Sequence, residues 1–255
     1  MADEHIVKAL AADVRYDGRK KLEYRDVKVE YGVSKSAEGS ARVSIGETVV
    51  MAGVKMELTT PYADRPNEGN IMVNAELLPL SSPRYEPGPP GEKATEIARV
   101  VDRGIRESKA IDTTKLCIAP GEKAWGVLID VVSINDAGNL QDAAALAAIA
   151  ALKNARLPQL SEHGQIDYDA TKTDKPLPLE REPVEVTVYK IGEHYFIDPL
   201  CTEEDSADAR LTIAVTEKDT ICALQKGGVG PLTVEDIDHM IGIAQKHSKQ
   251  LRKAL

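Results

Sequence analysis

Cysteine is scarce in this sequence, and the few cysteines present exclude a framework of disulfide bonds. The 255 residues include three of them, Cys117, Cys201 and Cys222, with no CxxC spacing. An odd number of isolated cysteines cannot pair completely, so we expect reduced thiols in an intracellular protein. A chain of this length can bury a hydrophobic core of its own, and we expect it to need no metal and no cofactor.

Long apolar runs, a basic leader and an excess of positive charge are also missing. No apolar segment approaches the roughly 20 residues that a membrane helix needs, and the opening MADEHIV lacks the features of a signal peptide. We therefore predict a cytoplasmic protein without a membrane segment. The formal net charge is −9. Because coating nucleic acid requires clustered lysine and arginine, any contact with RNA must be local.

Motifs for metals, nucleotides and nucleophiles are absent as well. The five histidines show no HxH or HExxH spacing and no pairing with cysteine: His5, His163, His194, His239 and His247. We therefore predict no transition-metal site. The sequence contains neither a Walker loop nor a nucleophile elbow, which removes two large classes of enzyme.

The first half of the chain contains short segments rich in β-branched residues, with partial alternation of apolar and polar positions. This pattern predicts strands at 26–33, 40–46, 48–58 and 70–77. A Pro/Gly cluster at 83–91 precedes a helical pattern at 92–109. The apolar strand at 125–134, which we expect to be covered on both faces, leads through NDAGN into an Ala-rich, buried helix at 141–155.

The last third repeats this order of strands followed by a helix. We predict strands at 183–191, 194–198 and 209–215, a further segment at 219–223, and a helix with Thr233 as its N-cap. The apolar stripe of that helix is predicted to be Ile237, Met240, Ile241, Ala244 and Leu251. A polar, Pro-bearing stretch at 158–183 separates the halves, which gives an N-terminal subdomain of residues 1–175 and a C-terminal subdomain of 176–255.

Three arginines mark one face of the helix predicted at 92–109. Arg99, Arg103 and Arg106 follow the spacing i, i+4 and i+7, opposite the apolar positions. Planar guanidinium groups at this spacing suit consecutive phosphates of a single nucleic-acid strand. The alternative is a solvated face, because Glu96, Asp102 and Glu107 also have the spacing of helical salt bridges with the arginines.

Two further groups of residues have both a chemical and a structural interpretation. The junction NDAGN offers backbone N–H groups at a helix N-terminus, a generic anion site, but its neighbours Asp136 and Asp142 carry the wrong charge for phosphate. A cluster of carboxylates at a strand end could bind Mg²⁺ or donate a proton, although a polar loop explains it equally well. The cluster consists of Asp198, Glu203, Glu204, Asp205 and Asp208.

Several separated motifs, in a fixed order, resemble the RNase PH family. They are RYDGR (15–19), EGSA (38–41), GETVVMAGV (46–54), PNEGN (66–70), VNAELLPLSSP (73–83) and the helix at 96–112, followed by 116–131 and IDPLCTEEDSADARLTI (197–213). Together they cover nearly the whole chain. The later motifs resemble the non-catalytic ring subunits of the archaeal exosome in particular, and the resemblance implies an α+β, RNase PH-like fold with two βαβ-containing halves packed together.

The chain departs from the catalytic members of that family where they bind phosphate. Those members carry a Gly-Gly-Ser/Thr-Arg type loop, whereas this chain has Asn139 and Leu140 at the last two positions. Losing a charge-assisted contact of this kind costs on the order of several kcal/mol. Asp208 matches the catalytic aspartate of the active relatives, but the preceding loop, which begins at Asp205, is shorter. We therefore expect no catalytic residue in this chain.

The resemblance implies a role in an assembly. Three such subunits alternate with three catalytic sisters in a hetero-hexameric ring, a trimer of dimers that carries RNA-binding cap subunits and admits single-stranded RNA. The family pattern assigns RNA binding to Arg99 and Arg103, and less firmly to Arg106 and to Arg65 in the loop PYADRPNEGN. Two alternatives stay open: a phosphorolytic 3′→5′ exoribonuclease that uses Asp205 or Asp208, and a purely architectural ring subunit.

Overall fold

Alternating apolar residues build the first sheet of the protein, which a computed structural model describes for residues 4–167 and 173–255. In β3 (Thr48–Thr59), buried residues alternate with partly exposed ones, as the period of two predicts. The strand order is β1-β2-β3-β6-β4, with β5 on β6. The other strands are β1 (Val27–Tyr31), β2 (Gly39–Ile45), β4 (Asn70–Leu77), β5 (Cys117–Ala119) and β6 (Lys123–Asn135). The sequence patterns predicted all of these except β5.

The pairing of β4 with β6 is parallel, whereas the other pairs of this sheet are antiparallel. A parallel pair needs a crossover, and α2 (Glu92–Glu107) and the short helix η1 (Thr113–Leu116) lie in it. One prediction about β6 is wrong. The strand is not covered on both faces, because Asp130 is exposed and Leu128 is half-buried, whereas Val127 and Ile129 on the other face are buried.

The second sheet has the order β10-β9-β7-β8 and is antiparallel throughout. Its elements are β7 (Val184–Ile191), β8 (His194–Ile197), α4 (Cys201–Asp205), β9 (Ala209–Val215) and β10 (Ile221–Gly227). Since β8 and β9 both run antiparallel to β7, they are parallel to each other, with α4 in their connection. No sequence pattern predicted α4, and β10 extends four residues beyond the predicted segment, to Gly227.

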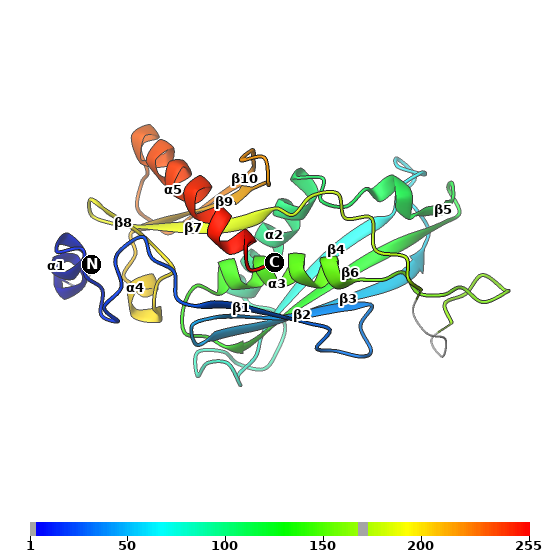
Figure 1. Ribbon diagram of the computed structural model, residues 1–255, viewed down its shortest axis with the longest axis horizontal. Coiled ribbons are helices and arrows are strands. Elements are labelled where there is room, and N and C mark those ends of the chain that lie inside the picture. Colours follow the sequence, from blue (N-terminus) through cyan, green and yellow to red (C-terminus); the bar gives the residue numbers. More distant parts are fainter. Residues whose placement is uncertain (1–3, 168–172) are drawn as a thin grey trace.

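Helices separate and cover the two sheets (Figure 1). The Ala-rich α3 (Leu140–Asn154) lies with α2 between the sheets and is almost entirely buried, as predicted. The outer helix α5 (Val234–Arg252) packs on β7 and β9. Its N-cap is Thr233, whose Oγ1 accepts the N–H of Asp236 at 3.2 Å, which confirms the predicted start. The short α1 (Glu4–Ala11), which was not predicted, lies near β8.

The chain passes from the first sheet to the second between Asn154 and Val184. The polar stretch predicted at 158–183 includes residues 168–172, and the opening MADEHIV includes residues 1–3; both groups lie outside the described part of the structure. The division between residues 175 and 176 stays a prediction. Within the described ranges, no helix combines the length and the apolar character needed to cross a membrane.

Candidate RNA-binding groove and phosphate junction

The arginine face of α2 borders an open groove of about 590 Å³. Arg99 and Arg103 are both exposed on one wall, as the helical spacing predicts, while Ile97 and Val101 on the opposite side are buried. The other lining residues come from the loop before α2, from α2 itself and from β10: Pro90, Gly91, Glu92, Thr95, Glu96, Val100 and Gln225. The groove therefore combines residues from both halves of the chain.

The two groove arginines differ in how they are held. Arg103 donates from Nη1 to the carbonyl oxygen of Leu224 at 3.3 Å and to Oε1 of Gln225 at 3.0 Å. Arg99 makes no hydrogen bond or ion pair with any residue in the ranges 4–167 and 173–255. A guanidinium that lacks a carboxylate partner keeps its full charge for an anionic ligand.

The proposed salt bridges along α2 form at only one of three positions. Asp102 accepts from Nε of Arg106 at 2.8 Å. Glu96 instead pairs with Arg210 of β9 at 2.6 Å. Glu107 has no ion pair within the described ranges. The salt bridges expected between Glu96 and Arg99 and between Arg103 and Glu107 therefore do not form in the described ranges, and both arginines are exposed.

Arg106 and Arg65 lie outside the group of residues that line this groove. The Nη2 group of Arg106 also donates to the carbonyl oxygen of Ile71, so its fork is largely occupied. Arg65 is exposed in the loop before β4 and lies 3.6 Å from the carboxylate of Asp64. The structure thus brings Arg99 and Arg103 together in one groove and separates Arg106 and Arg65 from it, and the RNA roles of all four stay predictions.

The predicted anion junction between β6 and α3 is filled by the chain itself. Asn139, the N-cap of α3, has a left-handed backbone with φ 60°, and its N–H donates to Oε2 of Glu204 at 3.3 Å. The Lys93 ammonium lies 3.9 Å from Glu204 and 3.5 Å from Asp136. Burial opposes the charged form of Lys93, but these two carboxylates raise its pKa. Lys93, which comes from α2, therefore balances the carboxylates at the junction.

A second cation closes the other side of the turn. Arg25 donates to the carbonyl oxygens of Ala137 at 2.9 Å and Gly138 at 3.0 Å, and pairs with Asp198 at 2.6 Å. Burial alone would raise the pKa of Asp198, but the hydrogen bonds and charge of Arg25 hold it below its usual range. The N–H donors of the Arg25 guanidinium are thereby occupied, so they do not serve a free phosphate at this turn.

The side chain of Leu140 points away from the junction. It is 1% exposed and packs in the core with Val50, Ile97 and Val131. A guanidinium in this orientation would be buried among apolar side chains at a large cost. The position that carries arginine in catalytic relatives is therefore part of the hydrophobic core in this chain.

The carboxylate cluster is dispersed into separate contacts. Glu203 is buried and forms a bidentate pair with Arg15, whose Nε lies 3.0 Å from Oε1. Asp205 pairs with Arg84 on the surface at 2.6 Å. The carboxylate of Asp208 accepts the N–H of Gly192 at 2.8 Å. In the described part of the chain, no group of three or more acidic, His or Cys side chains is arranged to hold a metal ion.

Residues that the sequence analysis did not single out carry much of this arrangement. Arg15 and Arg25 lie in the segment before β1, and Gln225 lies in the unpredicted part of β10. The motif RYDGR supplied a family signal for Arg15, but no periodic pattern revealed its partner 188 residues away. Gln225 had no signal at all.

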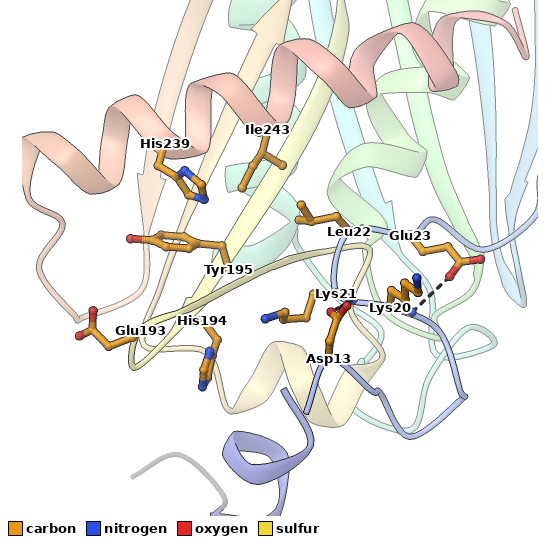
Figure 2. Close-up of a pocket in the computed structure, with 10 residues that line it drawn as sticks. All are labelled: Asp13, Lys20, Lys21, Leu22, Glu23, Glu193, His194, Tyr195, His239 and Ile243. Carbon is orange, nitrogen blue, oxygen red and sulfur yellow. Dashed lines mark hydrogen bonds between the residues drawn. The ribbon is translucent and has the colours of Figure 1, made fainter. Parts of the chain in front are cut away.

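A separate cleft of about 630 Å³ lies between the segment 13–23, the β7–β8 hairpin and α5 (Figure 2). The Tyr195 ring forms part of its wall, with its hydroxyl hydrogen-bonded to Asp236 and its centroid 4.7 Å from that of the His239 ring. None of the arginines predicted to bind RNA lines this cleft.

Comparison with known proteins agrees with this geometry. The model of the 3′ exoribonuclease family matches the chain over residues 23–158 for its domain 1 and over residues 182–247 for its domain 2. The chain belongs to the 3′ exoribonuclease (RNase PH) family. The predicted α+β, RNase PH-like fold is thereby confirmed.

Several proteins that are highly similar to this chain come from archaea. The exosome complex component Rrp42 of Methanothermobacter thermautotrophicus is 47% identical over 93% of this chain and 88% of its own length. The Rrp42 protein of Pyrococcus furiosus is 43% identical over 99% of this chain and 91% of its own length. A chain of the Archaeoglobus fulgidus exosome with RNA bound to the active site superposes with a TM-score of 0.90, at 44% identity and 98% and 96% coverage.

Proposed function

We propose that this member of the RNase PH family is a ring subunit of an archaeal-type exosome, acting in 3′→5′ RNA degradation without phosphorolytic activity of its own. It binds single-stranded RNA through Arg99 and Arg103 and structures the active site of a catalytic sister subunit. Two observations together support the proposal. Arg99 and Arg103 line the groove without a carboxylate partner among the described residues, and the Glu204 carboxylate already occupies the junction where a phosphate would bind.

The partners follow from the same proposal. The relatives are named as exosome components, and two of the matched structures are archaeal exosomes. We therefore infer a cytoplasmic hetero-hexameric ring, a trimer of dimers with a catalytic sister, capped by RNA-binding subunits. An acidic exterior is compatible with RNA entry, because the cationic groove is local and the steering field depends on the charges that line the path. In this proposal, Arg106 and Arg65 also contact RNA, outside the groove.

The RNA contact is tested by reversing the groove charges. The variant Arg99→Glu plus Arg103→Glu, reconstituted with the catalytic sister, should bind single-stranded RNA at least about tenfold more weakly, because two phosphate contacts are lost. The matched control reverses two exposed lysines near the end of α5, Lys246 in the helix and Lys253 at its C-cap, as Lys246→Glu plus Lys253→Glu, with the same change in net charge. Equal RNA affinity of the two variants would contradict the groove assignment.

The absence of independent catalysis needs a separate assay. The purified chain, incubated alone with single-stranded RNA and inorganic phosphate, should release no nucleoside diphosphates, whereas the ring with the sister should. Release by the chain alone would establish the phosphorolytic alternative. Ultraviolet crosslinking of RNA to the ring distinguishes the architectural alternative, which predicts no crosslink near residues 99–106.

A further inference from the structure

One wall of the arginine groove is held in place from the other half of the protein. α2 lies in the crossover between two strands of the first sheet, whereas Gln225 lies in β10, an edge strand of the second sheet. Side chains of α2 contact this sheet in two places. Glu96 pairs with Arg210 in β9 at 2.6 Å, and Arg103 donates to the Leu224 carbonyl oxygen at 3.3 Å and to Gln225 Oε1 at 3.0 Å in β10. The side of β10 that carries the Leu224 carbonyl therefore faces the helix.

The contacts of Arg103 occupy a particular part of its guanidinium. Both acceptors, the Leu224 carbonyl oxygen and Gln225 Oε1, receive their hydrogen bonds from Nη1. A guanidinium has five N–H donors, and the Nε–Nη2 edge is one of the edges that can donate two parallel bonds to a phosphate. With Nη1 held against β10, that edge stays available. Arg106 shows the opposite arrangement, since Asp102 accepts from its Nε at 2.8 Å and Ile71 accepts from its Nη2.

The amide of Gln225 is itself fixed. Its Nε2 donates to the carbonyl oxygen of Lys226 at 3.2 Å, which leaves Oε1 directed at Arg103. The acceptor is neutral, so it orients the guanidinium without cancelling its charge. A carboxylate at this position would make a stronger bond and would also neutralise the groove.

We propose that Gln225 is a positioning residue for RNA binding: it holds the Arg103 guanidinium with its bidentate edge toward a backbone phosphate of single-stranded RNA. Arg99, which lacks such a support, contacts RNA as a mobile charge. This inference rests on the proposed function, because it assigns a partner to one of the two groove arginines. It predicts that the effects of Gln225 and Arg103 on RNA affinity are coupled, whereas those of Gln225 and Arg99 are independent.

A double-mutant cycle on the reconstituted ring tests the proposal, with a labelled single-stranded oligoadenylate as probe. We expect Gln225→Ala to weaken binding about threefold to tenfold, the range of one net hydrogen bond. In the Arg103→Ala background the same change should have almost no effect. In the Arg99→Ala background it should keep its full effect. Gln225→Leu, which preserves the volume and removes the amide, should behave like Gln225→Ala.

The dependence on salt gives a readout that a general loss of structure would not move. The slope of log K against log salt is negative, and Arg103→Ala should make it shallower by about 0.7, the value for one phosphate contact on a single strand. Gln225→Glu should lower affinity despite keeping the hydrogen bond, because it neutralises Arg103. Gln165→Ala, an exposed glutamine far along the chain, is the matched control and should bind RNA normally.

The outcomes separate the two proposals. If Arg103→Ala weakens binding but Gln225→Ala does not, or if their effects simply add, the positioning role is wrong and the RNA groove stands. If Arg103→Ala leaves affinity unchanged, both the groove role of Arg103 and its positioning by Gln225 are wrong. Two results together support both the RNA groove and the positioning role: strong coupling between Gln225 and Arg103, and an undiminished effect of Gln225→Ala in the Arg99→Ala background.

Discussion

A buried carboxyl group in β7 should make the stability of the protein fall as the pH rises. Glu185 is 3% exposed and receives one hydrogen bond, from Gln141 Nε2 at 3.1 Å. Burial raises its pKa from 4.5 to about 8. The folded state therefore keeps a proton that the unfolded state releases above about pH 5. Stability is greatest when both states are protonated, and declines between the two pKa values.

The magnitude follows from this shift. Well inside the window, one extra proton in the folded state gives a slope of about 1.4 kcal/mol for each pH unit. Near the folded pKa the slope lessens, so we expect a loss of about 1 kcal/mol between pH 7 and pH 8. Asp142 has its pKa raised by burial to about 7, which places most of its contribution below this interval. His247, whose pKa burial lowers, also titrates below it.

The variant Glu185→Gln isolates the effect, because a neutral amide preserves the shape of the side chain and still accepts from Gln141. Urea unfolding is followed by the fluorescence of Trp125, the single tryptophan, which is 6% exposed in the folded chain. Between pH 7 and pH 8, wild type should lose about 1 kcal/mol more stability than Glu185→Gln. Equal pH dependence of the two proteins would refute the reasoning.

Two further substitutions test the packing around the site. Arg15→Ala should lower the free energy of unfolding by about 3–5 kcal/mol, because it leaves the buried Glu203 carboxylate unpaired; urea denaturation of the variant measures this, and a loss below 1 kcal/mol would contradict it. Gly104→Ala should also destabilise, since its Cβ would lie 2.4 Å from Oε1 of Glu185. Thermal unfolding should show a smaller penalty for Gly104→Ala in a Glu185→Ala background, and an unchanged penalty would contradict the clash.

The local elements followed largely from short-range patterns. Alternation in β3 and the helical period of α2 depend only on which side chains face the core, so they can be recognised without knowing the partner elements. Thr233 was identifiable as a cap because its hydroxyl bonds an N–H three residues away. α4 was missed because it contains five residues, mostly polar, and no apolar period can develop over one turn.

The sequence by itself determined most of the strands, the longer helices and the arginine face of α2, since each depends on neighbouring residues. Only the tertiary structure decided which charges are free. Glu96 has the spacing to neutralise Arg99, yet it pairs with Arg210 from a distant strand. Glu204 reaches the N-terminus of α3 from 65 residues away. Coulombic and hydrogen-bond energies depend on distance in space, which no spacing along the chain specifies.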